Sequence, residues 1–278
     1  MSSRLTYEQL GFYETFGFLS FPGLLNDRIE RIIAEFGALF ERKGGGHYGA
    51  PHDGKSRSCI VPFIDQSEYL SSLLDDPRIL AIATSLCGDD FVYSGSDGNY
   101  YVGDTGWHSD AMSPKHPYVK IAFYLDPLTR DTGALRVIPG SQLFGDRFAD
   151  GVHQQIGRSQ DNWGVMGRDI PAIALEVKPG DVLVFNQNIK HASFGGGAAR
   201  RMFTINLTSR FTPEREEDMR QYIASFARFW VDHVYGDEMV RTAGPERMKH
   251  LEQVMAADGF LAELSRKARE TMSEPSRG

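Results

Sequence analysis

Two histidines and one aspartate in this sequence are spaced so that they could bind a single metal ion. His108 and Asp110 are separated by one residue, and alternate residues of an extended segment face the same side, so both side chains can point at one site. His191 comes much later in the chain, as expected for a ligand that a second strand supplies. Two imidazoles and one carboxylate on one face of a metal leave further positions open, an arrangement that suits ferrous iron in enzymes that use O2.

The residues around His191 strengthen this interpretation. A lone His-x-Asp occurs by chance in many chains, and its alternative reading is a pair of surface or hydrogen-bonded residues. Here a turn at 178–181 leads into an apolar strand at 182–185, His191 follows the end of that strand, and Arg200 and Arg201 open the next one. A guanidinium can hold a carboxylate through two parallel hydrogen bonds, so one of these arginines could anchor a dicarboxylate co-substrate. The alternative is a solvated strand end.

The alternation of side chains along that next strand favours Arg200 over Arg201. Arg200 shares a face with Thr204 and Asn206, whereas Arg201 shares a face with Phe203 and further apolar residues that suit packing against helices. Arg201 remains the alternative.

The composition excludes several classes of protein. The 278 residues include 30 Lys and Arg against 37 Asp and Glu, a net charge of -7, and 41% hydrophobic residues. This apolar content can bury a sizeable core, and a net negative surface is a poor match for nucleic acid. The two cysteines are too few for a disulfide scaffold, and no apolar run reaches the ~20 residues that span a bilayer. We therefore expect a globular, cytoplasmic protein that binds neither nucleic acid nor membrane.

The elements that must position the metal ligands are predicted to belong to a single domain, 1–278. Its first part, 5–88, is predicted to be helical. Thr6 opens a capping box, and a second helix, capped by Asn26 or Asp27, carries apolar residues at steps of three and four. The spacing predicts that one face of this second helix packs on the rest of the domain.

The middle of the chain, 90–211, is predicted to be a β core. Short segments rich in β-branched and aromatic residues follow one another there without amphipathic helices between them, which favours a sandwich or barrel. We expect helices again at 213–272 and a frayed tail at 273–278. The fold class is thus mainly β with flanking helices, and the expected strands are 91–93, 118–125, 135–138, 173–177, 182–185 and 202–208.

Two long connections are predicted to wall a substrate pocket. The segments 47–57 and 144–171 lie where connections at the mouth of a barrel would lie, and long irregular loops often carry function. His153 and Trp163 in the second segment are the candidate contacts. For both segments the alternative is a simple surface excursion. Their mixed polarity favours a small polar or amphipathic substrate.

A series of motifs runs along the chain in a fixed order. It consists of Glu14-Thr-Phe-Gly-Phe-Leu-Ser-Phe-Pro-Gly23, Trp107-His-Ser-Asp110, Leu125-Asp-Pro-Leu-Thr-Arg-Asp-Thr-Gly-Ala-Leu-Arg-Val-Ile-Pro-Gly-Ser141, Pro179-Gly-Asp-Val-Leu-Val-Phe185, His191 and Arg200. This series resembles that of the phytanoyl-CoA dioxygenase family, to which ectoine hydroxylase is similar. The resemblance covers roughly 5–211, and the whole series is specific although no single motif is. The family consists of Fe(II)- and 2-oxoglutarate-dependent oxygenases built on a double-stranded β-helix, a jelly-roll of the cupin type.

The resemblance implies a set of cofactors and a role for each site residue. It makes His108, Asp110 and His191 the ligands of Fe(II) and Arg200 the partner of the distal carboxylate of 2-oxoglutarate, with O2 as the oxidant. Asn99 matches an amide that helps to hold 2-oxoglutarate in similar enzymes, with a turn residue as its alternative. Related halogenases lack the carboxylate that Asp110 supplies. The resemblance therefore implies hydroxylation or another oxidation of a small molecule, with decarboxylation of 2-oxoglutarate to succinate.

Two other classes remain open from the sequence. The protein could be a catalytically silent metal-binding barrel that acts as a binding or regulatory module. It could also be a cupin-type hydrolase or isomerase that uses zinc or manganese, although such sites usually carry more histidines. We expect a monomer or a homodimer in either case.

Overall fold

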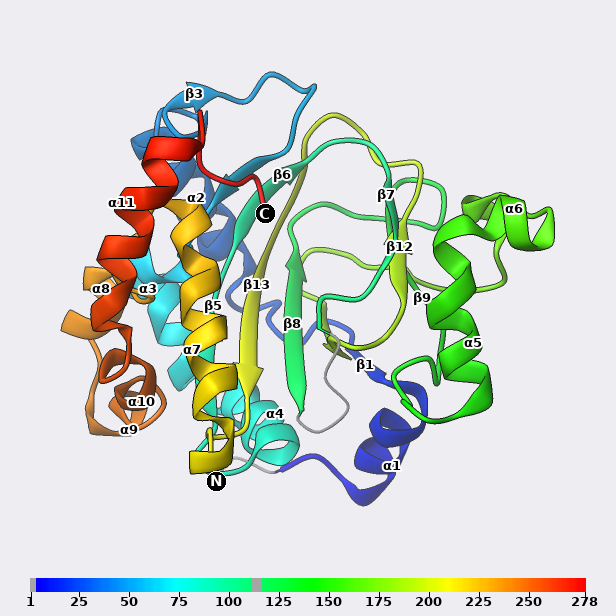
Figure 1. Ribbon diagram of the computed structural model, residues 1–278, viewed down its shortest axis with the longest axis horizontal. Helices are drawn as coiled ribbons and strands as arrows, with labels where there is room; N and C mark the ends of the chain where they lie inside the picture. The colour runs from blue at the N-terminus through cyan, green and yellow to red at the C-terminus, as the bar shows by residue number, and fades with distance from the viewer. Residues whose placement is uncertain (1–3, 112–116) are drawn as a thin grey trace.

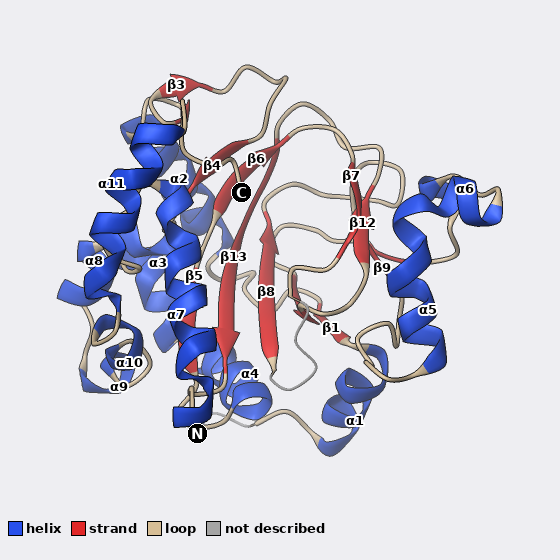
Figure 2. Cartoon of the chain, in the orientation of Figure 1, coloured by secondary structure: helices blue, strands red, loops and turns tan. Residues whose placement is uncertain are grey.

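Antiparallel strands form the centre of the molecule, and helices flank them on two sides (Figures 1 and 2). The computed structural model describes residues 4–111 and 117–278. It confirms the mainly β fold with flanking helices that the sequence predicts. The strands are β1 (Phe18–Phe21), β2 (Gly46–His47), β3 (Ala50–Pro51), β4 (Ser58–Ile60), β5 (Val92–Gly95), β6 (Gly98–Tyr101), β7 (Thr105–His108), β8 (Tyr118–Tyr124), β9 (Leu135–Val137), β10 (Ile173–Leu175), β11 (Val182–Asn186), β12 (His191–Ser193) and β13 (Arg200–Thr208).

The helices gather at the two ends of the chain and in one insertion (Figure 1). Among the described residues, no helix is both long and apolar enough to cross a membrane. The α-helices are α1 (Tyr7–Phe16), α2 (Ile29–Arg42), α3 (Glu68–Ser71), α4 (Pro77–Cys87), α5 (Arg147–Gln155), α6 (Ser159–Trp163), α7 (Glu216–Ser225), α8 (Asp237–Arg241), α9 (Pro245–Met248), α10 (Glu252–Met255) and α11 (Leu261–Thr271).

Two sheets of unequal size face each other. The major sheet has the order β1-β11-β8-β13-β6-β4, with β5 also paired to β13, and the minor sheet has the order β10-β9-β12-β7. Among the described residues, every pair of neighbouring strands is antiparallel. In the described parts of the chain no ladder joins the two sheets, so the fold is an open two-sheet jelly-roll and not a closed barrel.

The major sheet packs on helices with one face and on the minor sheet with the other. Along β8, Val119, Ile121 and Phe123 belong to the large apolar core beneath the helices, whereas Ala122 and Tyr124 belong to the cluster between the sheets. This alternation follows from the two-residue period of a strand. The helical layer that includes α2 and α7 covers the first face, while α5 and α6 lie beyond the minor sheet (Figure 1).

The boundaries of the N-terminal helices test the capping predictions. Thr6 caps α1 in a complete capping box, as predicted. The prediction of a cap at Asn26 or Asp27 is wrong, because α2 begins at Ile29 and its N-cap, Arg28, makes no capping hydrogen bond with its side chain. Asp27 instead pairs with Arg78, their closest atoms 2.6 Å apart. That ion pair attaches the start of α2 to α4.

The expectation of a frayed tail is also wrong. The carbonyl of Pro275 lies 2.9 Å from Nε2 of His47, and the backbone amide of Ser276 donates to the carbonyl of Arg228. Arg277 donates to the carbonyl of Arg57 at 2.8 Å. The tail therefore lies across the end of the major sheet near β6, where Figure 1 shows the C-terminus.

Candidate metal centre and the cavities around it

The three candidate ligands meet between the two sheets. His108 ends β7, Asp110 follows it by two residues, and His191 begins β12. One ligand atom from each residue can be chosen so that all three lie within 4.8 Å of one another. Nε2 of His191 lies 3.4 Å from the Asp110 carboxylate and Nε2 of His108 lies 3.7 Å from it. The geometry thus brings together the three residues that the sequence selected.

Strand pairing and backbone hydrogen bonds fix the two imidazoles. His108 and His191 are direct partners in the β7–β12 ladder, and their ring centroids are 4.2 Å apart. Nδ1 of His108 lies 2.8 Å from the carbonyl of Gly106, and Nδ1 of His191 lies 3.0 Å from that of Ile189. A carbonyl requires a proton on Nδ1, so each Nε2 keeps a free lone pair for a metal.

A lysine balances the charge of the carboxylate. Nζ of Lys120 lies 2.8 Å from Oδ2 of Asp110. Burial opposes the charged form of Asp110, but Lys120 and His191 outweigh it, and the pKa of the carboxyl lies below its usual range. Burial lowers the pKa of His191 to about 4, so its imidazole is neutral near pH 7, as a metal ligand must be. The donor set therefore fits a divalent metal ion.

A narrow inner cavity extends from these ligands between the sheets. Its volume is about 60 Å³, and Lys120, Tyr124, Ser193, Arg200 and Thr204 are among the side chains that line it. Tyr124 and Arg200 are both buried, and burial raises the pKa of the Tyr124 phenol to about 12. The cavity thus joins the candidate ligands to a buried guanidinium.

The two neighbouring arginines point in different directions. Arg200 lines the inner cavity, donates to the carbonyl of Gly133 at 2.6 Å and donates to the hydroxyl of Ser193. Arg201 is absent from the lining of that cavity and pairs with Asp126, their closest atoms 2.6 Å apart. This arrangement follows the strand phase that favoured Arg200.

Asn99 lies beside the site and is already hydrogen bonded. Its Oδ1 accepts from Nε of Arg57 at 2.8 Å, and its Nδ2 donates to Asp97 at 2.5 Å and to the Met202 sulfur at 3.5 Å. Asn99 is fully buried in β6 and is not among the residues that line the inner cavity. In this geometry its amide orients Arg57 and Asp97.

A larger outer cleft adjoins the inner cavity at the ligands. It has a volume of about 670 Å³ and shares His108, Asp110, Lys120, Tyr101 and Thr105 with the inner cavity. Its further lining comes from Arg57 and Asp97, from Trp107 and Tyr118, from Gly278, and from the region of α7 and the 3-10 helix η6 (Phe226–Phe229). The polar end of this cleft thus lies at the metal ligands, and aromatic side chains form much of its wall.

One of the two predicted pocket walls is wrong. Arg57 at the end of 47–57 lines the outer cleft, but no residue of 144–171 lines it or the inner cavity. Much of that second segment is helical and packs outside the minor sheet through Val152 and Ile156. His153 contacts the carbonyl of Ser141 at 2.7 Å, and Trp163 donates to Gln155.

Two further residues that line the inner cavity, Lys120 and Ser193, carry signals in the sequence but are not among the predicted site residues. Lys120 is a charged residue between Val119 and Ile121 in an apolar strand, and it shares a face with Tyr124. Ser193 follows His191 by two residues, so it points to the same side. No local sequence pattern indicates that residues of α7 and η6 line the outer cleft, because they do so together with residues far away in the sequence.

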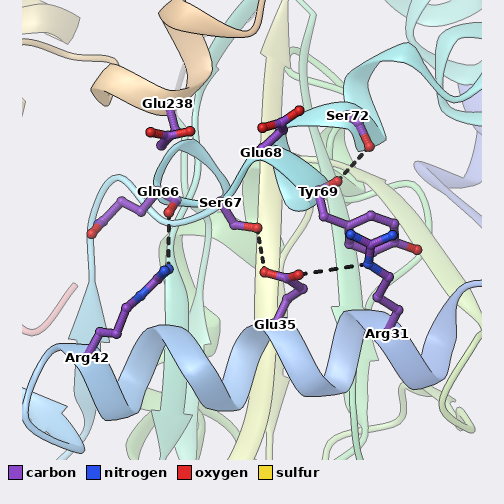
Figure 3. Close-up of a pocket in the computed structure, with 9 residues that line it drawn as sticks. All are labelled: Arg31, Glu35, Arg42, Gln66, Ser67, Glu68, Tyr69, Ser72 and Glu238. Atoms are coloured by element: carbon purple, nitrogen blue, oxygen red, sulfur yellow. Dashed lines mark hydrogen bonds and ion pairs between the residues drawn. The ribbon is translucent and has the colours of Figure 1, made fainter.

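A second large cleft lies away from the metal ligands. Figure 3 shows this cleft, about 730 Å³, between α2 and the segment around α3. Glu35 accepts from Ser67 at 2.7 Å and pairs with Arg31 at 3.8 Å, and the guanidinium of Arg31 lies over the Tyr69 ring. Glu68 and Glu238 pair with Arg241, so the acidic side chains of this cleft have partners, and none of the candidate site residues lines it.

Two facing sheets with a His-Asp-His triad between them and open space beside it form the arrangement that is typical of facial-triad, non-haem metal oxygenases. The family model described as phytanoyl-CoA dioxygenase (PhyH) matches residues 13–202, and the chain belongs to this family. Membership indicates Fe(II)- and 2-oxoglutarate-dependent oxygenase activity. Comparison with curated protein sequences gives no match.

Solved structures with a similar fold include several such oxygenases. HygX from Streptomyces hygroscopicus, solved with nickel and 2-oxoglutarate, is 18% identical, with 75% of this chain and 88% of that chain covered and a TM-score of 0.57. SnoK, a carbocyclase from nogalamycin biosynthesis, is 20% identical over 74% and 84% of the chains, with a TM-score of 0.58. EctD from S. alaskensis, solved with 2-oxoglutarate and 5-hydroxyectoine, is 20% identical over 74% and 77%, with a TM-score of 0.55. These likenesses establish the fold, and the His-Asp-His triad of this chain fits Fe(II).

Proposed function

We propose that this protein is an Fe(II)- and 2-oxoglutarate-dependent dioxygenase, with 1–278 as one oxygenase domain. It would hydroxylate or otherwise oxidise a small molecule and convert 2-oxoglutarate to succinate. One observation carries the proposal: the His108, Asp110 and His191 donors and the buried Arg200 line the same cavity between the sheets. A metal ligand set at one part of a cavity and a carboxylate-binding cation at another match the two ends of 2-oxoglutarate.

His108, Asp110 and His191 are the proposed metal ligands. Their Nε2 atoms and the carboxylate face one another, and backbone carbonyls hold both imidazoles in the correct tautomer. Bound Fe(II) would supply the redox chemistry that activates O2. The protein contributes the fixed donors and a site between the sheets that limits the access of water.

Arg200 is the proposed partner of the distal carboxylate of 2-oxoglutarate. The carbonyl of Gly133 and the hydroxyl of Ser193 hold its guanidinium, which leaves donors for a ligand because arginine has five N–H groups. The Ser193 hydroxyl donates to the same Gly133 carbonyl at 3.0 Å and accepts from Arg200, so it fixes the position of the guanidinium. Arg201 is engaged with Asp126, so we assign it a structural role.

The outer cleft is the proposed substrate site. Its volume of about 670 Å³ falls within the usual range for small-molecule sites, and it shares the metal ligands with the inner cavity. Arg200 lines the inner cavity and not this cleft, so a substrate in the cleft would leave Arg200 free for 2-oxoglutarate. HygX and EctD have been solved with hygromycin B and 5-hydroxyectoine, respectively, which supports a small-molecule substrate for this chain as well.

The test is a screen of small molecules with Fe(II), 2-oxoglutarate and O2. The expected result is succinate formation that requires Fe(II) and a product heavier by one oxygen atom. Two-electron oxidations without oxygen insertion would give succinate and a lighter product. A hydrolase or isomerase would convert substrate without consuming 2-oxoglutarate, and a silent binding module would form no succinate with any compound.

The variant Asp110→Gly tests whether Asp110 is a metal ligand. If Asp110 binds the metal, the variant should lose hydroxylation and leave a position at which chloride or azide can bind. Retained hydroxylation would remove Asp110 from the proposed triad.

A further inference from the structure

The ammonium group of Lys120 lies beside the candidate ligands and is needed neither for metal binding nor for the distal carboxylate of 2-oxoglutarate. Lys120 projects from the middle of β8 between Val119 and Ile121, and its side chain is 17% exposed. It borders both the inner cavity and the outer cleft. A buried charge costs free energy unless a partner of opposite charge is present, and in this structure that partner is Asp110 at 2.8 Å.

A bound metal and 2-oxoglutarate would use the charge of Asp110. The two positive charges of Fe(II) and the one of Arg200 balance the single negative charge of Asp110 and the two of 2-oxoglutarate. These four groups are therefore neutral together. When Asp110 binds the metal, its negative charge no longer balances the positive charge of Lys120.

The remaining acid of the outer cleft is already engaged. Asp97 accepts from Asn99 at 2.5 Å and from the hydroxyl of Thr204, and it pairs with Arg57 at 3.4 Å. Apart from Asp97 and Asp110, the described residues that line this cleft include no acidic side chain. Asp97 faces both Lys120 and Arg57. Once Asp110 serves the metal, the three cationic side chains of the cleft, Lys120, Arg57 and Arg228, therefore outnumber its one remaining acidic side chain.

The rest of the cleft adds cationic and aromatic surface. The guanidinium of Arg57 lies 4.2 Å above the Tyr101 ring and borders the cleft, and Arg228 lines it from η6. Trp107, Tyr118, Tyr222, Phe226 and Phe229 supply aromatic side chains to the same cleft.

We infer that the substrate of the proposed oxygenase is a small organic anion, whose carboxylate or phosphonate group binds Lys120 and Arg57 and whose apolar body lies against the aromatic wall. This inference rests on the proposed function, because it needs Asp110 to serve the metal. Since Lys120 reaches a metal ligand, the acidic group would lie close to the metal. The oxidised carbon is then expected within a few bonds of that group.

The first arm of the test measures binding of matched probes to wild-type protein loaded with Ni(II) and 2-oxoglutarate, which binds ligands without turnover. The probes are 3-phenylpropionate, 2-phenylethylphosphonate, 3-phenylpropanamide and 3-phenylpropylamine, titrated by calorimetry. We expect at least one acid to bind about 30-fold or more tightly than the amide and the amine, since loss of one member of a desolvated charge pair costs at least about 2 kcal/mol and 1.4 kcal/mol corresponds to tenfold.

The second arm assigns this preference to Lys120. In Lys120→Met the acids should bind within about threefold of the amide, and Lys120→Arg should restore most of the preference because it keeps a cation. Lys249→Met removes an exposed lysine that pairs with Glu246 and should keep the wild-type preference. Circular dichroism verifies that each variant is folded.

Three results would overturn the inference. Wild-type protein could bind the acids no better than the amide, or bind none of the probes at millimolar concentration. Alternatively, Lys120→Met could keep the full preference for acids and lose affinity for 2-oxoglutarate, which would assign the ammonium to the co-substrate. Failure of the proposed function looks different, because wild-type protein would then fail to bind Ni(II) and 2-oxoglutarate before any probe is added.

Discussion

The two faces of the major sheet differ sharply although the same strands form both. Toward the minor sheet, β8 and β13 present Lys120, Arg200 and Thr204, which are charged or polar and line a cavity. Toward the helices the same strands present Ile121 and Phe203, which are fully buried in the apolar core. One face holds the chemistry of the site, and the other holds the sheet against the helical layer.

Successive residues of β8 and β13 therefore face opposite sides of the major sheet, so one of two neighbours contributes to the site and the other to the stability of the fold. A shift of one residue in register would exchange the two faces, so the apolar face also fixes the direction of the cavity side chains. Substitutions on the cavity face should change activity, and substitutions on the helix face should change the free energy of unfolding.

The largest effect is expected at the metal ligands. His191→Ala removes one of three donors and should lower Fe(II)-dependent succinate formation by more than about 100-fold, because even partners that only orient metal ligands are worth about 10- to 100-fold. His153→Ala is the matched control, since His153 contacts the Ser141 carbonyl outside both cavities. Activity of His191→Ala comparable to that of His153→Ala would exclude His191 as a ligand.

The helix face should give the largest change in stability. Phe203 is fully buried and stacks on Phe123 with ring centroids 4.4 Å apart. Phe203→Ala should lower the free energy of unfolding in urea by about 3 to 5 kcal/mol, as large-to-small changes in cores do. The affinity of the folded variant for 2-oxoglutarate should stay within about threefold of wild type. A stable Phe203→Ala with lost co-substrate affinity would contradict the division between the faces.

A buried acid in the helical layer should make stability depend on pH. Asp65, in the 3-10 helix η1 (Ile64–Gln66), accepts from Tyr93 at 2.5 Å and Ser96 at 3.0 Å. Burial raises its pKa to about 6, against hydrogen bonds that lower it. The folded state then holds a proton that the unfolded state releases above about pH 4, so this contribution to stability is present at low pH and is lost as pH rises through 6.

Between pH 4.5 and 7.5 this group alone should lower the free energy of unfolding by about 2 kcal/mol. Asp65→Asn cannot titrate and should lack that part of the pH dependence. Urea titrations of both proteins at the two pH values give the difference, and identical pH profiles would show that Asp65 keeps an ordinary pKa in the fold.

The smallest effects should separate the true wall of the outer cleft from the segment that the sequence suggested. Phe229 lines the cleft, and Phe229→Ala should raise KM for the substrate by about tenfold, the value of part of an aromatic contact. Trp163→Ala should leave KM unchanged, because Trp163 lies on α6 and lines neither cavity. Steady-state kinetics with the substrate found in the screen measures KM for both variants. A larger increase in KM for Trp163→Ala than for Phe229→Ala would show that 144–171 forms a wall of the substrate pocket.

The candidate ligands and Arg200 could be selected from the sequence because the two-residue period of each strand decides which of its residues share a face. The two-residue period places His108 with Asp110, and it places Arg200 apart from Arg201, whose side chain pairs with Asp126. The same rule would have found Ser193. The alternation of side chains within one strand is enough to decide which of these residues face the cavity.

The outer cleft could not be predicted in the same way, because it forms where distant segments meet. Arg57, the η6 residues and the tail around Gly278 line it together, and no local pattern reports their contact. The prediction that 144–171 forms a wall of the pocket is wrong for a different reason. Asp146 caps α5 by accepting from the amides of Phe148 and Ala149, and an aspartate at this position is a helix start signal that argues against an irregular loop.

The central claim is that the cavity face of the major sheet holds 2-oxoglutarate through Arg200, and titration of 2-oxoglutarate into Ni(II)-loaded protein tests it most directly. Arg200→Gln leaves a carboxylate without its cation and should weaken binding about 30-fold or more. Arg201→Gln removes a half-exposed ion pair with Asp126 and should stay within about threefold of wild type. Equal losses in the two variants, or a larger loss in Arg201→Gln, would contradict the assignment of the two faces.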